Sequence, residues 1–301
     1  MNIVVIIPTY NEKDNIGHLL DELHKEFNKI DHSMYILVVD DNSPDGTSVV
    51  VRDAKLIYPN IHLIIGQKKG LGTAYIRGMK YAMEYLHADA VMEMDADFSH
   101  KPADVPRMIL AMDEGTDFVI GSRYIRGGTI PDNWGLKRKV ISRWGNIFPR
   151  YLASLYKVRD CTVGFRAIRT RLLKKIDLSS FRVQGYAFQI ALLSKAMKNK
   201  AIIKEIPVEF VDRIRGKTKL GLSDIIEFIL NAVWIRFDNN GTFIKFAAIG
   251  ASCVLVSLGL FALLLYLGLN KFIASPIAIA ISIISTFLFN NFWTFGYRKT
   301  K

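Results

Sequence analysis

Two long apolar stretches near the C-terminus constrain this 301-residue chain more than any other feature. Residues 241–269 contain a single charge, Lys245, and residues 272–295 contain none. Each stretch exceeds the ~20 apolar residues that cross a bilayer, so we predict two spanning helices over about 246–268 and 272–295. Buried helices of a soluble fold are the alternative, but these stretches have too little polar surface to meet water.

The link between the two stretches is Asn270-Lys271, which is so short that the helices must form a hairpin. Both outer ends should therefore face the same compartment. The basic tail, with Arg298, Lys299 and Lys301, indicates that this compartment is the cytoplasm. The first apolar run, Ile3–Ile7, is too short for a secretory signal and has no cleavage-site pattern after it, so we expect no signal peptide. We expect an integral membrane protein with a cytoplasmic N-terminal part, in the plasma membrane of an archaeon or bacterium rather than in the endoplasmic reticulum.

Before these stretches, short apolar runs typical of buried strands alternate with amphipathic segments of helical period. The predicted strands are 3–7, 35–39, 62–65, 91–94 and 118–120, and the predicted helices are 16–27, 47–56, 71–85 and 103–112. This order predicts an α/β fold with a mainly parallel sheet covered on both faces. Later, we predict a strand at about 164–168, a helix over 186–197, a strand around 202–210, and an amphipathic stretch over 223–237 at the membrane surface.

Acidic residues stand where two predicted strands end. Asp40-Asp41 closes one strand, and Asp95-Ala96-Asp97 closes another. Open α/β sheets bind ligands beyond the carboxyl ends of their strands, and alternate residues in extended chain share a face. Two carboxylates in this arrangement suit Mg²⁺ or Mn²⁺ bridging a diphosphate. We therefore predict an enzyme that uses a nucleotide-activated substrate; a solvated acidic turn is the alternative.

Three further motifs follow predicted strands. Tyr10, just after the first strand, offers a ring that can stack on a base. Gly70-Leu71-Gly72 could cradle phosphate at a helix start, although tight packing explains the glycines equally well. Arg123, after the strand at 118–120, could neutralise charge on a diphosphate or on an acceptor phosphate.

The formal net charge of +12 is concentrated in one segment. Between Arg123 and Arg159 there are nine basic residues and a single acid, Asp132. Such a segment in a membrane protein suits anionic lipid or phosphate ligands. Nucleic acid is a less favoured partner, because the sequence contains no recognised nucleic-acid-binding module.

Four motifs follow one another along the chain: Pro8-Thr9-Tyr10-Asn11-Glu12, Asp40-Asp41-Asn42-Ser43-Pro44-Asp45, Asp95-Ala96-Asp97-Phe98-Ser99-His100-Lys101-Pro102 and Gly121-Ser122-Arg123-Tyr124. In this order and spacing they resemble those of the inverting glycosyltransferases of family 2, which have a GT-A fold, and within that family those of the polyprenyl (dolichyl) phosphate mannose synthases. This resemblance covers about residues 1–235. Residues 241–297 resemble half of a four-helix membrane domain of the GtrA type, so either two helices suffice or the chain is truncated.

The resemblance and the hydropathy pattern together predict three parts: a GT-A domain over 1–221, amphipathic interfacial helices over 222–240 and a two-helix transmembrane domain over 241–301. It also implies the reaction, which is inverting transfer of mannose from GDP-mannose to a polyprenyl or dolichyl monophosphate at the cytoplasmic membrane face. The cofactor would be Mg²⁺ or Mn²⁺.

Residue roles carry over from the same motifs. Asp97, Arg123 and Arg138 are the implied catalytic residues, and the arginines lie near the lipid phosphate. The implied donor-binding residues are Pro8, Tyr10, Glu12, Asp41, Asp45, Gly72, Asp95, Ala96, Asp97, Arg123, Arg213 and Lys219. Asp95 and Asp97 are the implied metal ligands, with Ser99 as a third where the family often has glutamine.

Other functions remain open at this point. The same reaction could use a UDP-sugar and transfer glucose or an N-acetylhexosamine. A non-enzymatic lipid carrier or scaffold would need the membrane hairpin but not the paired acids. A processive polysaccharide synthase would carry Gln-x-x-Arg-Trp, whereas Val140 stands at the glutamine position before Arg143-Trp144.

Overall fold

The structure is a computed structural model that describes residues 1–153, 155–181, 186–212 and 241–294. The chain divides into two compact units, Met1–Val233 and Trp234–Lys301. The predicted amphipathic stretch at 223–237 and both predicted domain boundaries, near 221 and 240, lie outside the described residues, so these remain predictions.

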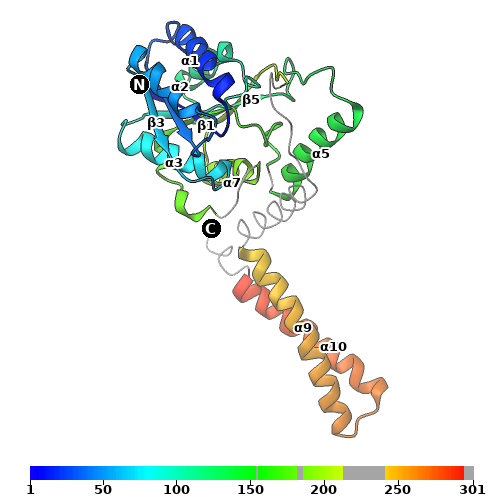
Figure 1. The fold of residues 1–301 in the computed structure, drawn as a ribbon. Coiled ribbons are helices and arrows are strands. Elements are labelled where there is room, and N and C mark those ends of the chain that lie inside the picture. The colour runs from blue at the N-terminus through cyan, green and yellow to red at the C-terminus, as the bar shows by residue number, and fades with distance from the viewer. Residues whose placement is uncertain (154, 182–185, 213–240, 295–301) are drawn as a thin grey trace. The chain divides into compact units, whose positions relative to one another are not determined.

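A seven-stranded sheet with the order β3-β2-β1-β4-β6-β5-β7 forms the centre of the first unit (Figure 1). Its strands are β1 (Asn2–Thr9), β2 (Ser33–Asp40), β3 (Ile61–Ile65), β4 (Ala90–Glu93), β5 (Phe118–Ser122), β6 (Arg166–Arg169) and β7 (Ile203–Pro207). Neighbouring strands pair in parallel except at β6, which is antiparallel to β4 and to β5. The predicted α/β fold class with a mainly parallel sheet is therefore confirmed.

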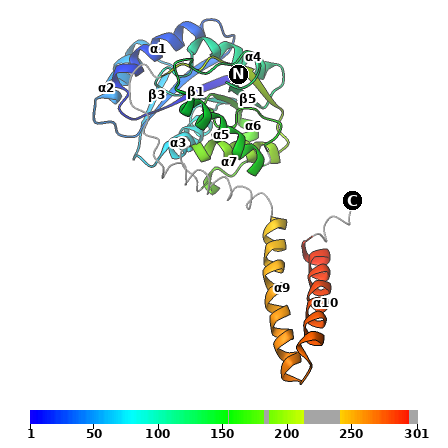
Figure 2. The ribbon, with the colours of Figure 1, turned by 90° about the vertical axis from the view of Figure 1, so that its right-hand side faces the viewer.

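Helices cover both faces of this sheet, as Figure 2 shows. They are α1 (Lys13–Phe27), α2 (Thr47–Ile57), α3 (Leu71–Glu84), α4 (Val105–Asp113), α5 (Leu136–Leu152), α6 (Thr170–Leu173) and α7 (Tyr186–Lys198), with short 3₁₀ turns at Pro102–Asp104 and Leu178–Ser180. α1, α2 and α4 lie on one face, and α3 and α7 lie on the other. Central strands are buried on both sides, which explains why Ile3 to Ile7 form an unbroken apolar run with no exposed surface.

Most predicted elements agree with the structure to within a few residues. Two described helices were not predicted: the short α6, and α5, which was expected only as part of a basic segment. It connects β5 to the β6 side of the sheet and begins directly after Gly135. It carries Arg138, one of the predicted catalytic residues.

The second unit is a helical hairpin made of α9 (Gly241–Tyr266) and α10 (Lys271–Phe289), followed by a π-helical turn at Asn290–Thr294. Lys245–Tyr266 and Lys271–Thr294 are long and apolar enough to cross a bilayer. The Asn270 side chain accepts a hydrogen bond from the Phe272 N–H at 3.0 Å and so caps α10. Between the helices, the Ser282 hydroxyl donates to the Cys253 carbonyl at 2.8 Å.

Candidate active site

The predicted donor and metal residues lie at the edge of the sheet where the parallel strands end. Tyr10 follows β1, Asp41 follows β2, Asp95 follows β4 and Arg123 follows β5. Because β6 runs the opposite way, its first residue, Arg166, lies at this same edge opposite Glu93. The topology therefore gathers side chains from distant parts of the sequence along one rim.

The two acids at the end of β2 have different environments. Asp40 is buried, and it accepts hydrogen bonds from the Thr9 hydroxyl at 2.9 Å, the Ser43 N–H at 2.9 Å and the Ser43 hydroxyl at 2.6 Å. These bonds join the end of β1 to the turn after β2. Asp40 thus fixes the loop, and this leaves Asp41 as the acid that lines a pocket.

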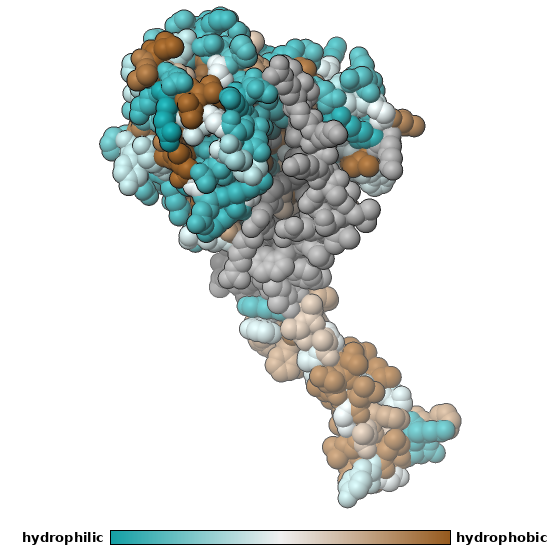
Figure 3. All heavy atoms as spheres, viewed as in Figure 1, coloured by the Kyte–Doolittle hydropathy of each residue, from teal (hydrophilic) through white to brown (hydrophobic). Residues whose placement is uncertain are grey.

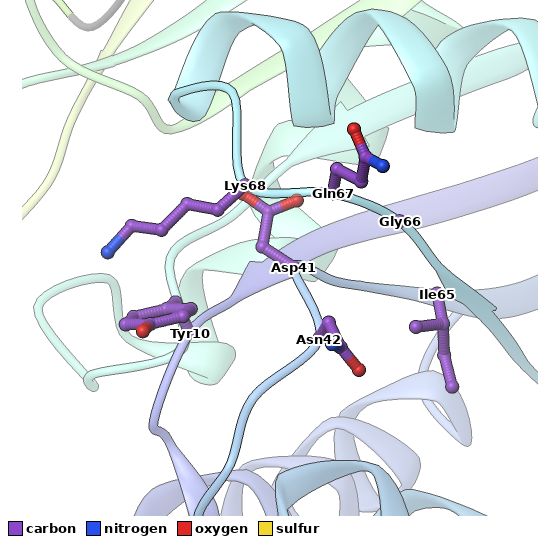
Figure 4. Close-up of a pocket in the computed structure, with 7 residues that line it drawn as sticks. All are labelled: Tyr10, Asp41, Asn42, Ile65, Gly66, Gln67 and Lys68. Atoms are coloured by element: carbon purple, nitrogen blue, oxygen red, sulfur yellow. The ribbon is translucent and has the colours of Figure 1, made fainter.

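That pocket lies beside the ends of β1, β2 and β3, as Figure 4 shows. It is lined by Tyr10, Asp41, Asn42, Ile65, Gly66, Gln67 and Lys68. The Tyr10 ring is partly exposed, and the Lys68 ammonium lies 3.4 Å from the centre of that ring. A ring, a carboxylate and backbone groups converge here, which is an arrangement that can hold a planar base.

Asp41 is positioned by a residue that the sequence analysis did not identify. The Arg77 guanidinium donates from Nη2 to Asp41 Oδ1 at 2.7 Å. Gly66 makes room for this pair, because a Cβ at Gly66 would lie 2.2 Å from Arg77 Nη1. The missing side chain at position 66 is therefore a condition for the Arg77–Asp41 contact.

The predicted donor residues Glu12 and Asp45 join two loops. Asp45 accepts hydrogen bonds from the N–H groups of Lys13 at 3.0 Å and Thr47 at 2.9 Å, and from the Thr47 hydroxyl at 2.6 Å. Burial alone would raise the pKa of Asp45, but these hydrogen bonds together outweigh burial and hold the pKa below its ordinary value. Glu12 accepts from the Asn15 side chain at 2.8 Å, and its N–H donates to the Thr47 hydroxyl at 3.0 Å. Both acids hold the β1–α1 and β2–α2 connections together, and their contact with a donor remains a prediction, as does that of Pro8 within β1.

Asp95 and Asp97 follow β4 in a turn that the protein holds in place. Asp95 Oδ1 accepts from the Tyr75 hydroxyl at 3.3 Å, and the Asp95 N–H donates to His100 Nδ1 at 3.1 Å. Asp97 is 7% exposed and accepts from the Ser99 N–H at 3.0 Å. Ala96 between them is buried. The turn therefore presents two carboxylates whose backbone positions are fixed by hydrogen bonds.

His100 supports this turn as a neutral imidazole. Its Nδ1 accepts the Asp95 N–H, so the ring proton is on Nε2, which lies 3.9 Å from Asp95 Oδ2. Burial lowers the pKa of His100 and favours the same neutral form. The ring stacks on Phe165 with centroids 4.9 Å apart.

The donor set at this turn fits a cation that is shared with a ligand. Among the described residues, no group of three or more histidine, cysteine, aspartate or glutamate side chains could hold a metal ion. Mg²⁺ and Mn²⁺ bind about six oxygen ligands, and several of these are commonly water molecules and phosphate oxygens. Asp95 and Asp97 can supply hard oxygens, while diphosphate and water supply the rest. Ser99 is 2% exposed, and its hydroxyl as a third protein ligand remains a prediction.

Arg123 is fixed by a buried partner, Asp160. Its Nε donates to Asp160 Oδ2 at 2.7 Å and its Nη2 donates to Oδ1 at 2.9 Å, while its backbone N–H donates to Oδ2 at 3.0 Å. Asp160 has no exposed surface. Burial raises the pKa of Asp160, but the Arg123 guanidinium and its hydrogen bonds lower it more. Arg123 was predictable from the sequence, whereas Asp160 was not, because its one signal is an acid directly after a long basic segment.

Arg138 lies in the first turn of α5. It forms an ion pair with Asp212 at 2.8 Å and lies over the Trp134 ring at 4.0 Å. Trp134 contacts Phe210 with ring centroids 5.9 Å apart, and Phe210 contacts His100 at 6.1 Å. A chain of aromatic rings thus connects Arg138 to the turn that carries Asp95. Arg213 and Lys219 lie outside the described residues, just beyond Asp212.

Two buried charged residues, Glu93 at the end of β4 and Arg166 opposite it in β6, were not identified from the sequence. Glu93 and Arg166 have no exposed surface. Burial raises the pKa of Glu93 to about 7, although the Arg166 charge lowers it. Arg166 donates from Nη1 to the Gln189 carbonyl at 2.6 Å and from Nη2 to the Cys161 carbonyl at 2.8 Å. These hydrogen bonds join β6 to α7 and to the segment that carries Cys161.

Gly72, a predicted donor-binding residue, lies at the start of α3 and packs tightly against α7. A Cβ at this position would lie 2.8 Å from Phe188 Cβ and 2.9 Å from Phe188 Cγ. This observation favours the packing explanation of the glycine, and a contact with phosphate remains a prediction.

We expect Gly72→Ala to destabilise the first unit by about 1–3 kcal/mol, because the added methyl group must push the Phe188 side chain and α7 away. Urea unfolding of the detergent-solubilised chain, followed by far-UV circular dichroism, measures this loss. Gly145→Ala is the matched control, since nothing lies within 4 Å of a Cβ there. Equal stability of Gly72→Ala and the wild type would show that a methyl group fits at position 72 without displacing Phe188.

Comparisons with known proteins give a consistent result. The sequence profile described as "Glycosyl transferase family 2" matches residues 4–177, and the profile "GtrA/DPMS, transmembrane domain" matches residues 245–301. A polyprenol monophosphomannose synthase from Mycolicibacterium smegmatis is 39% identical over 226 residues, which are 74% of this chain and 83% of that protein. A dolichol-phosphate mannosyltransferase from Pyrococcus furiosus is 33% identical over 298 residues, which are 98% of this chain and 81% of that protein.

Solved structures show the same fold at low sequence identity. Mannosyl-3-phosphoglycerate synthase from Rubrobacter xylanophilus has a TM-score of 0.60 and 19% identity, covering 80% of this chain and 75% of that one. Glucosyl-3-phosphoglycerate synthase from Mycobacterium tuberculosis, solved with Mn²⁺, uridine diphosphate and glucosyl-3-phosphoglycerate, has a TM-score of 0.57 and 17% identity, covering 80% of each chain.

Proposed function

Since the chain belongs to glycosyltransferase family 2 and carries a GtrA/DPMS transmembrane domain, we propose that it transfers mannose from GDP-mannose to a polyprenyl or dolichyl monophosphate. The transfer takes place with inversion at the cytoplasmic face of the membrane. Mg²⁺ or Mn²⁺ assists it. The observation that carries this proposal is the turn at Asp95 and Asp97, set at the rim of the sheet beside a pocket that can hold a base.

The names of the similar proteins support the acceptor and the sugar. Both relatives compared above are named for transfer of mannose to a polyprenol or dolichol phosphate. The hydrophobic hairpin α9–α10 supports an acceptor that is itself held in a bilayer. Asp41, with one oxygen held by Arg77, can accept a hydrogen bond from an N–H at the edge of guanine.

The proposed chemistry is a direct displacement at the anomeric carbon. An oxygen of the lipid phosphate attacks this carbon, a new carbon–oxygen bond forms, and the bond to the donor diphosphate breaks so that GDP leaves. The lipid phosphate is already an anionic nucleophile at neutral pH, so the reaction needs no strong general base. The main tasks of the protein are to align the two substrates and to stabilise the charge that develops on the departing diphosphate.

Asp95 and Asp97 would hold the divalent ion, which would supply Lewis-acid stabilisation of the leaving diphosphate. Arg123, held rigidly by Asp160, can place its guanidinium near developing negative charge without a cost for ordering its side chain. Arg138 in α5 is the candidate contact for the acceptor phosphate. The pair of arginines would reduce the repulsion between two anionic substrates.

A direct assay tests this function. The full chain in lipid nanodiscs, given radiolabelled GDP-mannose, Mn²⁺ and a polyprenyl phosphate, should form an organic-soluble mannolipid. UDP-glucose and UDP-N-acetylglucosamine serve as competing donors in parallel reactions. Transfer from a UDP-sugar but not from GDP-mannose would contradict the proposed donor, and no transfer from any of the three would contradict the proposed reaction.

Gly66→Ala tests the base pocket. The new methyl group should displace the Arg77 guanidinium from Asp41, since Cβ would lie 2.2 Å from Arg77 Nη1. Loss of this charge-assisted contact should raise the KM for GDP-mannose about tenfold with little change in kcat. Stability should change little, because the end of a flexible side chain can move. Gly135→Ala, with open space around its Cβ, is the control, and an unchanged donor KM in Gly66→Ala would exclude the pair from donor binding.

A further inference from the structure

The Phe210 side chain contacts three parts of the candidate site. Its ring meets the His100 ring edge-on, with centroids 6.1 Å apart and an angle of 70° between the planes. His100 in turn accepts a hydrogen bond at 3.1 Å from the backbone N–H that begins the acidic turn, residues 95–97. The Arg123 guanidinium lies 5.3 Å from the centre of the Phe210 ring, and the Trp134 ring meets Phe210 edge-on at 5.9 Å. Phe210 therefore joins the acidic turn to Arg123 and to Trp134.

The backbone around Phe210 is held from two sides. The Phe210 N–H donates to the Thr129 carbonyl at 3.1 Å, and the next N–H, that of Val211, donates to the Ser99 carbonyl at 3.4 Å. Thr129 belongs to the segment that leads from β5 into α5, and Ser99 closely follows the acidic turn. Phe210 is therefore held between the acidic turn and the approach to α5.

The two arginines of the site are held to different degrees. Arg123 makes three hydrogen bonds to the buried Asp160, and its own side chain is only 10% exposed. Arg138 pairs with Asp212, but these two side chains are 42% and 34% exposed, so water competes for the same hydrogen bonds. Arg123 thus has a fixed place of its own, whereas Arg138 needs further support.

Trp134 supplies that support, and packing sets the place of its ring. The Arg138 guanidinium lies 4.0 Å from the centre of the Trp134 ring, which is buried. The indole N–H has no hydrogen-bond partner among the residues that the structure describes. The ring is therefore oriented by packing, which includes the contact with Phe210 at an interplanar angle of 73°. Aromatic pairs favour such an edge-on geometry.

We propose that Phe210 is a positioning residue, which sets Arg138, through Trp134, at a fixed place relative to the acidic turn and Arg123. Two substrates that react in line must be aligned closely, because a misplacement of about 1 Å can lower a rate about a hundredfold. This consequence for sugar transfer rests on the proposed function, in which the acidic turn serves the donor and Arg138 serves the acceptor. The placement of α5 by Phe210 concerns packing alone.

Phe210→Leu tests the consequence for transfer, because leucine stays apolar but has no ring. The full chain is assayed in nanodiscs, since the second unit has the extended hydrophobic surface seen in Figure 3. The kcat per bound GDP should fall by about ten- to a hundredfold. The KM for GDP-mannose should stay within about threefold of the wild-type value, because Phe210 does not line the base pocket.

Two further variants separate positioning from packing. In an Arg138→Ala background, Phe210→Leu should lower kcat by less than about twofold, since the group that Phe210 positions is absent. Phe27→Leu, at the buried C-terminal end of α1, is the matched control and should keep the wild-type kcat.

A distance measurement tests the placement itself, without donor, acceptor or metal. Val140→Cys on α5 and Leu110→Cys on α4, at positions that are 46% and 61% exposed, carry nitroxide labels in a Cys253→Ala background. Cys161 does not react, because it has no exposed surface and burial raises the pKa of its thiol to about 12. Double electron–electron resonance should give a narrow distribution of label-to-label distances in the parent chain and in Phe27→Leu, and a broader one in Phe210→Leu.

Any of three results would overturn the inference: a kcat of Phe210→Leu equal to that of Phe27→Leu, an equal loss of kcat with and without Arg138, or a distance distribution that Phe210→Leu leaves unchanged. Failure of the proposed function looks different. No mannolipid from the wild-type chain, together with a distribution that broadens in Phe210→Leu, would contradict the proposed function and support the placement of α5 by Phe210.

Discussion

Replacing Asp97 with alanine is expected to lower sugar transfer by at least about a thousandfold, because the leaving diphosphate would lose several kcal/mol of charge stabilisation by the ion. Asp97 is almost fully buried, and its carboxylate is aimed by the Ser99 N–H at 3.0 Å. A neighbouring side chain therefore cannot easily take its place. The measurement is the initial rate of mannolipid formation at saturating donor and Mn²⁺.

Two further variants serve as comparisons for Asp97→Ala. Asp132→Ala removes an exposed acid and should leave the rate unchanged. Ser99→Ala keeps the N–H that orients Asp97 and removes only the hydroxyl, so a loss within about tenfold is expected if the hydroxyl contacts the ion at most through water. A rate in Asp97→Ala close to that of the wild type would contradict the metal role of this residue. A loss in Ser99→Ala as large as that in Asp97→Ala would place the hydroxyl on the ion.

Asp160→Ala is expected to destabilise the first unit by about 3–5 kcal/mol, because the variant leaves the nearly buried Arg123 guanidinium without its partner. For a unit of this size, the loss corresponds to a drop in Tm on the order of 10 °C. Differential scanning fluorimetry of the detergent-solubilised chain measures it. Transfer activity should also fall, since Arg123 would no longer be held at the rim.

The double variant Arg123→Met/Asp160→Leu is the control for stability, since removing both charges leaves neither one unpaired. It should recover most of the lost stability but none of the transfer activity. The pKa of Asp160 is lower in the folded protein than in the unfolded protein. The ionised Asp160 side chain therefore stabilises the fold fully at pH values above the unfolded pKa of about 3.9. This contribution is lost as the pH falls from there through the folded pKa. A Tm of Asp160→Ala equal to that of the wild type at pH 7 would show that the pair contributes nothing.

The elements that were predictable from the sequence are those with a strong local signal. The strand at Ile3–Ile7 is an unbroken apolar run because β1 is buried on both faces. The helices α9 and α10 were predictable because lipid-facing helices need no polar side. Asp95 and Asp97 could be found because they directly follow a buried strand, which placed them at the rim once the sheet was known to be mainly parallel.

The contacts that the sequence analysis missed join residues far apart in the chain. Arg77 reaches Asp41 only because α3 packs beside the end of β2, and Gly66 leaves the space between them. Asp160 reaches Arg123 through the close pairing of β5 with β6. Neither partner follows a pattern that local spacing could reveal.

Helix α5 was missed for a different physical reason. Its apolar residues have helical spacing, but basic residues are interleaved with them, so the segment looked like a charged surface. In the structure its buried residues are Asn146, which hydrogen-bonds to Cys161, and Pro149, while the large apolar residues of the helix are exposed. A rule that places apolar residues inside a protein fails for a helix whose apolar side faces outward.

Electron paramagnetic resonance of Mn²⁺ tests the central claim of a metal held at Asp95 and Asp97 against a nucleotide diphosphate. With GDP present, the wild-type chain should bind Mn²⁺ and show magnetic coupling between the ion and the phosphorus nuclei of GDP. Asp97→Ala should lose the bound ion while Asp132→Ala keeps it. Equal Mn²⁺ binding by Asp97→Ala, or a bound ion with no coupling to the GDP phosphorus nuclei, would contradict the account.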